Sequence, residues 1–174
     1  YKYFNNIDLV LAALIDKANL QGNYMEQIDE IMESDNASDV ILHNLFLVSE
    51  QYFSDMLISY NKILFELSTF FAYNPERRER INKKVTTSST FGYLTQCALR
   101  IMMTGVERGD FVPVLLVKDI MAFIIASFDG IIRDVTLSRC YSGNSEPESG
   151  VVFDEKNLIH CLYISTMSLL GKSE

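Results

Sequence analysis

The chain has few of the residues that build disulfide frameworks, metal centres or nucleophilic active sites. Its 174 residues include three cysteines and two histidines. Cys97, Cys140 and Cys161 are widely spaced, with no Cys-x-x-Cys pair, which argues against a disulfide framework and a zinc ribbon. His160 and Cys161 are neighbours and would point apart on a helix, so they do not suggest a nucleophile and its base. Glycine-rich phosphate loops and nucleophile elbows are also absent, and we expect neither an enzyme nor a cofactor or metal.

Positive charge and long apolar runs are scarce as well. The chain has 15 lysines and arginines against 23 acidic residues, a net charge of −8. A nucleic-acid-binding surface needs the opposite balance, so this chain is not expected to bind DNA by itself. No uncharged apolar run is long enough to span a bilayer, and no secretory signal is visible. The length and the 48% hydrophobic content fit one globular domain, expected in the cytoplasm.

No stretch alternates apolar and polar residues for long enough to predict a sheet. Apolar residues recur instead at spacings of three and four, and all three prolines fall between these patterns. We therefore predict an all-α fold with about six helices. The expected helices cover residues 5–33, 41–56, 62–71, 75–108 and 115–137, and the last begins at 154.

The stretch from residue 91 to residue 137 organises the chain as two buried helices separated by a turn. Gly109 can adopt positive φ and is expected to end the first helix. The second is apolar over most of its circumference, so it must be covered on more than one side. Ala122, Ala126 and Gly130 recur every four residues and form a stripe that a second helix can approach closely. Tight packing within one chain would explain this stripe; we favour a subunit interface because a chain of this size has a modest core.

A second set of side chains is a candidate ligand site. His43 is a polar residue in an apolar helix, typical of either a hydrogen-bonded core histidine or a ligand contact. Arg100 carries its charge among apolar residues, so it needs an internal carboxylate, a bound anion or access to solvent. Polar groups on apolar walls are typical of pockets for apolar or amphipathic molecules, although the aromatic members of the set would equally fill a core. The predicted set is His43, Phe46, Phe65, Phe70, Tyr93, Gln96, Arg100 and Met103.

Several fragments, in order along the chain, resemble TetR-family transcriptional regulators. The Tyr-Lys-Tyr-Phe start, with an acidic and an aliphatic residue at fixed spacing after it, is similar to the end of that family's helix-turn-helix domain. Three later fragments are similar to the opening of its seventh helix, the turn before its eighth and a mid-helix signature. The resemblance covers essentially the whole chain. The fragments are residues 1–4 with Asp8 and Val10, residues 74–80, residues 105–111 and residues 129–131.

The resemblance implies that residues 1–4 are a remnant of the DNA-binding domain and that residues 5–174 form the ligand-binding and dimerisation domain. Members of the family dimerise through their last two long helices. The interface implied here comprises Ala122, Ala126, Gly130, Ile159, Leu162 and Thr166. Tyr1 and Tyr3 are implied contacts to DNA phosphates.

The expected function is that of a ligand-responsive transcriptional regulator, with repression as the expected mode. It would act as a homodimer with a small-molecule effector. It would reach operator DNA only through a domain upstream of this chain, and no membrane is involved. The alternative is a helical coactivator or interaction module of the same fold that has no DNA-binding domain of its own.

Overall fold

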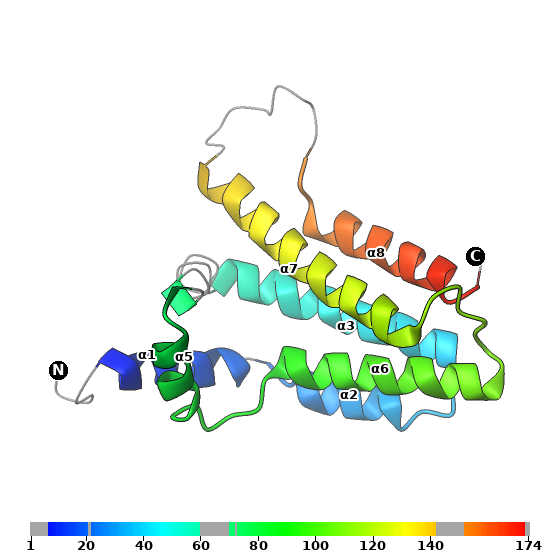
Figure 1. Cartoon of the computed structure of the whole chain (residues 1–174), viewed down its shortest axis with the longest axis horizontal. Coiled ribbons are helices and arrows are strands. Elements are labelled where there is room, and N and C mark those ends of the chain that lie inside the picture. Colours follow the sequence, from blue (N-terminus) through cyan, green and yellow to red (C-terminus); the bar gives the residue numbers. More distant parts are fainter. Residues whose placement is uncertain (1–6, 21, 60–69, 72, 142–151, 173–174) are drawn as a thin grey trace.

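The computed structural model describes residues 7–20, 22–59, 70–71, 73–141 and 152–172. Within these ranges the chain forms seven α-helices and no strand, which confirms the all-α prediction (Figure 1). The helices are α1 (Ile7–Asn19), α2 (Tyr24–Met32), α3 (Ser38–Ser59), α5 (Pro75–Asn82), α6 (Thr90–Arg108), α7 (Val117–Tyr141) and α8 (Glu155–Leu169). None of the described helices combines the length and apolar character that crossing a bilayer requires.

The prediction of a single helix over residues 5–33 is wrong, because this stretch forms two helices, α1 and α2. Gly22 adopts a φ of 73°, in the left-handed region that favours glycine, and separates α1 from α2. A Cβ atom at this position would lie 2.6 Å from the ring of Tyr24, which is buried at the start of α2. The glycine therefore ends one helix and lets Tyr24 fold back into the core.

The expected helix over residues 75–108 is also two helices, α5 and α6. The segment between them is held by Asp16 of α1, whose carboxylate accepts hydrogen bonds from the backbone N–H and hydroxyl groups of Thr86 and Thr87, at 2.8 to 3.0 Å. The Thr87 hydroxyl is the main cause that lowers the pKa of Asp16. Ser89 then caps α6 by accepting the N–H of Gly92 at 3.1 Å. These bonds satisfy the polar groups that a continuous helix would have satisfied internally.

Other expected boundaries are confirmed. Gly109 follows α6 with a φ of 79°, and the Asp154 side chain caps α8 by accepting the N–H of Asn157 at 2.9 Å. The helix expected from residue 115 begins at Val117 and continues to Tyr141. The helix expected over residues 62–71 lies mostly outside the described residues.

The helices pack around α3, which contacts α2, α6, α7 and α8 (Figure 1). Phe128 of α7 is buried at the centre, with its ring centroid 4.9 Å from Phe53, 5.9 Å from Phe46 and 6.0 Å from Phe91. This aromatic cluster ties α7 to both α3 and α6. At the end of the molecule where α1 begins, α1 packs on α5, and Arg77 donates a hydrogen bond to Asp8 at 2.8 Å.

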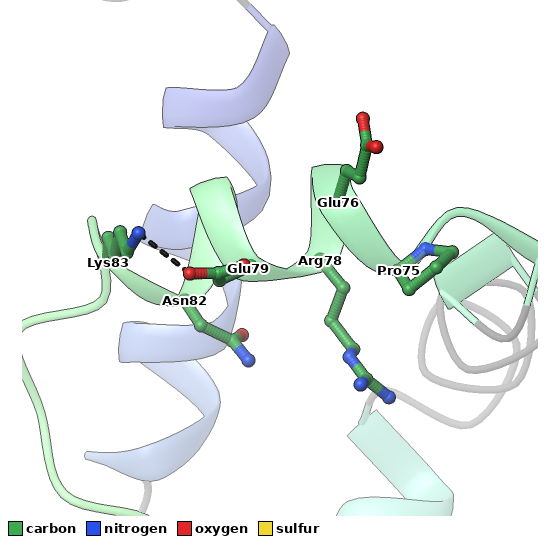
Figure 2. A pocket seen from close by; sticks show the side chains of 6 residues that line it. All are labelled: Pro75, Glu76, Arg78, Glu79, Asn82 and Lys83. Atoms are coloured by element: carbon green, nitrogen blue, oxygen red, sulfur yellow. Dashed lines mark ion pairs between the residues drawn. The ribbon is translucent and has the colours of Figure 1, made fainter.

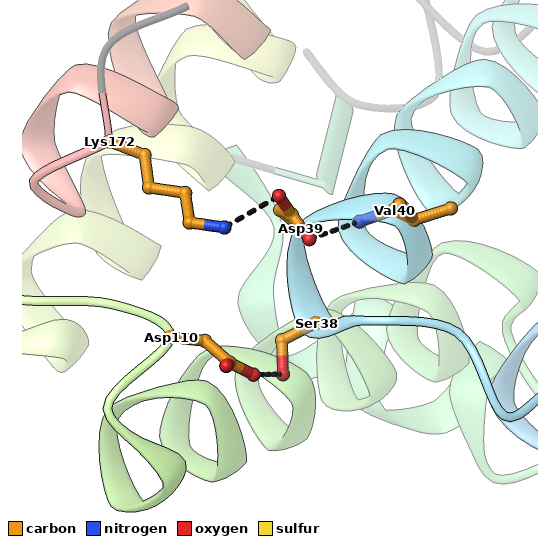
Figure 3. A network of polar contacts seen from close by, with 5 residues as sticks. All are labelled: Ser38, Asp39, Val40, Asp110 and Lys172. Atoms are coloured by element: carbon orange, nitrogen blue, oxygen red, sulfur yellow. Dashed lines mark hydrogen bonds and ion pairs between the residues drawn. The ribbon is translucent and has the colours of Figure 1, made fainter.

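The end of α8 is tied to the beginning of α3 and to the turn after α6 (Figure 3). The Lys172 ammonium lies 2.6 Å from the Asp39 carboxylate, and this hydrogen bond is the main cause that lowers the pKa of Asp39. The Ser38 hydroxyl donates to Asp110 at 2.6 Å. Gly171 has a φ of 77°, and a Cβ atom there would lie 2.2 Å from a carbonyl oxygen of the turn. The chain therefore reverses at a glycine so that Lys172 reaches Asp39.

Candidate functional site: an open face on α7 and α8

One side of α7 is buried and the opposite side is open. Ile120, Ile124 and Phe128 face the core. The open side carries Lys118, Asp119, Ala122, Phe123, Ile125, Ala126, Asp129 and Arg133. Phe123 is 44% exposed and Ile125 40% exposed, which is high for large apolar side chains in a long helix. The sequence predicts that this helix is covered on more than one side. In the structure its own chain covers α7 on one side only.

The turn before α7 also carries exposed apolar side chains. Its backbone is fixed, because the N–H groups of Val112 and Val114 donate to the carbonyl oxygens of Leu170 and Leu169, each at 2.9 Å. Phe111 points inward and is buried. The other apolar side chains of the turn point outward, with exposed fractions between 53% and 74%: Val112, Val114, Leu115 and Leu116. The turn therefore presents a cluster of apolar side chains on a fixed backbone.

The open side of α8 differs from the predicted one. Ile159, Leu162 and Thr166 are all buried within their own chain and leave little area for a second copy. The exposed side of α8 is instead formed by residues at helical spacing, most of them small: Asn157, Cys161, Ile164, Ser165 and Ser168. The spacing of the small residues in the sequence was the available signal for this face.

Two residues of the predicted ligand set, His43 and Phe46, lie where α3 contacts α8. His43 is exposed, and its ring stacks on Tyr163 with centroids 4.8 Å apart. It is thus neither a core histidine nor enclosed by a pocket. Phe46 is buried and packs on Tyr163 and Phe128. His160 lies 6.5 Å from the same tyrosine ring, a proximity that its sequence position did not indicate.

The predicted ligand face of α6 is largely open to solvent. Gln96, Arg100 and Met103 are exposed. Arg100 forms no ion pair within the described part of the chain; its guanidinium lies 3.7 Å from the sulfur of Cys97. Tyr93 donates to the carboxylate of Asp29 on α2, and this hydrogen bond is the main cause that raises the pKa of Tyr93 to about 12.

The remaining predicted residues lie elsewhere. Phe70 packs at the α1–α5 end, where the Arg77 guanidinium lies 5.0 Å from its ring centroid. Phe65, Tyr1 and Tyr3 lie outside the described residues. The described members of the ligand set therefore occupy separate environments: the core, the α3–α8 contact, the α2–α6 contact, the solvent-exposed side of α6 and the α5 end.

An open depression lies along α5, and none of its lining residues belongs to the predicted ligand set (Figure 2). It is lined by Pro75, Glu76, Arg78, Glu79, Asn82 and Lys83. Lys83 pairs with Glu79 at 2.7 Å, and the two cations and two carboxylates balance. This balance gives no preference for an anionic or a cationic ligand. Among the described residues, no three histidine, cysteine or acidic side chains are grouped as a metal site would require.

The geometry defines an all-α protein whose most distinctive surface is the open face of α7, its preceding turn and α8. No family model, curated protein or solved structure matches the chain. The likeness to TetR-family regulators therefore depends on the sequence fragments alone.

Proposed function

We propose that this chain is the dimerising, ligand-sensing domain of a TetR-like transcriptional regulator whose DNA-binding domain lies upstream. The observation that carries the proposal is the open face of α7 and α8. A long helix with exposed Phe123 and Ile125 beside a ridge of small residues favours contact with another protein surface. The two helices concerned are those through which the resemblance implies dimerisation.

The size of the open surface supports a stable interface. Seven large apolar side chains on it are between 39% and 74% exposed: Val112, Val114, Leu115, Leu116, Phe123, Ile125 and Ile164. Their exposed area is on the order of several hundred Å², approaching the roughly 800 Å² per partner of a standard interface. Exposed apolar side chains gathered on adjoining elements favour a surface that another protein covers.

The contacts of α1 support a regulatory role. Under this proposal the DNA-binding domain joins the chain just before α1, and α1 is held to α5 and to the segment after it by Asp8–Arg77 and by the four hydrogen bonds of Asp16. A ligand that binds one arrangement of the helices better than another would shift α1 through these contacts. The differential affinity for the two arrangements is what drives such a change.

Sedimentation velocity tests the dimer directly. The chain should sediment as a dimer at micromolar concentration, and Ala126→Arg should give monomers, because a long charged side chain on the small-residue ridge prevents close approach. Gln96→Arg introduces the same side chain on exposed α6 and should leave the dimer intact. Circular dichroism of both variants checks that each still folds. A wild-type monomer at high concentration, or a dimer of Ala126→Arg, would remove the observation on which the proposal depends.

A second candidate is a helical interaction module of the same fold without a DNA-binding domain. The net charge of −8 and the apolar turn of residues 112–116 favour contacts with protein over contacts with nucleic acid. The upstream coding sequence separates the two candidates, since a basic helix-turn-helix pattern supports the regulator. Native mass spectrometry of the purified chain tests ligand sensing: a co-purifying small molecule supports it, and binding to none of a panel of apolar and amphipathic compounds counts against it.

A further inference from the structure

We propose that two copies of the chain pair α7 against α7 in an antiparallel arrangement centred on Ala126, which places Asp119 of each copy beside Arg133 of the other. The inference depends on the proposed function in one respect, namely that two copies associate. It adds the orientation, the register and the charge pairs of that association.

The orientation follows from the charges at the two ends of the open side of α7. Asp119 lies at its beginning, and Arg133 lies near its far end. In a parallel pair related by a two-fold axis, each of these charges would meet its own copy and repel it. In an antiparallel pair Asp119 meets Arg133. Charge complementarity therefore selects the antiparallel pair.

The register follows from the symmetry of the same face about Ala126. Ala122 and Gly130 each lie four residues from Ala126, and Asp119 and Arg133 each lie seven residues from it. When Ala126 lies on the two-fold axis, Ala122 of one copy is opposite Gly130 of the other. With a rise of 1.5 Å per residue, the two Asp119–Arg133 pairs lie about 10 Å on either side of the axis.

The local packing leaves room for this approach. A Cβ atom built on Gly130 meets no other atom within 4 Å, and both alanines are exposed. Small residues allow helix axes to come within about 8 Å, and a shallow crossing of about 20° keeps the charged ends within reach. Phe123 and Ile125 lie on either side of the small ridge, where each would be covered by the second copy.

The charged ends can re-pair at little cost. Arg133 contacts Asp134 of its own chain at 3.1 Å, and the two side chains remain 58% and 43% exposed. An exposed ion pair of this kind contributes little to stability. The Arg133 guanidinium therefore has donors available for Asp119 of the second copy.

A charge-exchange experiment tests the pairing. Asp119→Arg and Arg133→Asp, each alone, should weaken the dimer about tenfold or more in sedimentation equilibrium, because two symmetry-related pairs become repulsive. The two substitutions combined should restore the dissociation constant to within about threefold. Glu107→Arg, an exposed reversal on α6, is the control and should have little effect. A combined variant as weak as the single variants would overturn the pairing.

Cysteine cross-linking tests the register independently, in a background with Cys140→Ser and Cys161→Ser. Oxidation should link Ala126→Cys chains to one another. It should not link Ala122→Cys chains, whose equivalent positions are about 12 Å apart along the axis, beyond the reach of about 7 Å for a disulfide. A mixture of Ala122→Cys and Gly130→Cys chains should link.

The outcomes separate this inference from the proposed function. A dimer by sedimentation in which Ala126→Cys does not link, or in which Ala122→Cys links to itself, overturns the register and leaves dimerisation standing. A chain that stays monomeric at high concentration overturns both. Cross-linking at Ala126 together with rescue by charge exchange supports the arrangement as proposed.

Discussion

Adding one methyl group should have opposite effects at two glycines that both lie inside helices. At Gly105 of α6, a Cβ atom would lie 2.3 Å from Cδ2 of Phe111 and 3.1 Å from Cβ of Ser38. At Gly130 of α7 it would meet nothing within 4 Å. The two positions share the intrinsic helical benefit of alanine over glycine, about 0.5 to 1 kcal/mol. The difference between them therefore reports local packing.

The magnitude at Gly105 depends on whether Phe111 can move. Favourable carbon contacts lie at about 3.5 to 4.0 Å, so the ring would have to shift by more than about 1 Å. Phe111 is buried, its N–H donates to the Gly105 carbonyl oxygen, and the Lys172 ammonium lies 5.8 Å from its ring centroid. Overpacking in such a site costs about 1 to 3 kcal/mol, which outweighs the helical benefit. We expect Gly105→Ala to destabilise the fold by about 1 to 2 kcal/mol.

Urea denaturation followed by circular dichroism measures both variants. Gly130→Ala should stabilise the fold by about 0.5 to 1 kcal/mol when it is measured in the Ala126→Arg background, where no second copy packs against Gly130. Gly105→Ala should cost less stability in a Phe111→Leu background than in the wild-type chain, because the smaller side chain leaves room for the added methyl group. Equal stability of Gly105→Ala and wild type would refute the packing of Phe111 against α6 described above.

Three further substitutions probe the core and the tie at the end of α8. Thr166→Val should stabilise the fold by about 1 kcal/mol in urea denaturation, because the Thr166 hydroxyl is buried and has no hydrogen-bond partner among the described residues. Phe128→Ala should cost about 3 to 5 kcal/mol in the same assay, since its ring joins three helices. Lys172→Met should cost about 0.5 to 1 kcal/mol at neutral pH through loss of the pair with Asp39. Because Lys172 lowers the pKa of Asp39 below its unfolded value of 3.8, this difference should disappear as the pH falls through the lowered pKa in acid denaturation curves.

The helical content was predictable, and the breaks in it were only partly so. Gly109 and Asp154 act through neighbours in sequence, so their roles as helix terminators could be inferred from the residues themselves. The break after α5 depends on Thr86 and Thr87 reaching Asp16, which lies 70 residues earlier in the chain. Local periodicity contains no information about such a partner. A continuous helix over residues 75–108 was therefore the expectation, and tertiary hydrogen bonds replaced it with two.

The candidate interface was also only partly predictable from the sequence. On α7 the small residues recur at a spacing that one chain does not need, and Ala122 and Ala126 are exposed in the structure. On α8 the apolar residues were assigned to the interface, but Leu162 and its neighbours are used by the core. The side of α8 that remains open carries Cys161 and Ser165, whose polarity resembles that of an ordinary solvated surface. Large apolar residues of a helix that borders a core are usually buried in the core of their own chain. The small residues of such a helix are therefore the better guide to its open side.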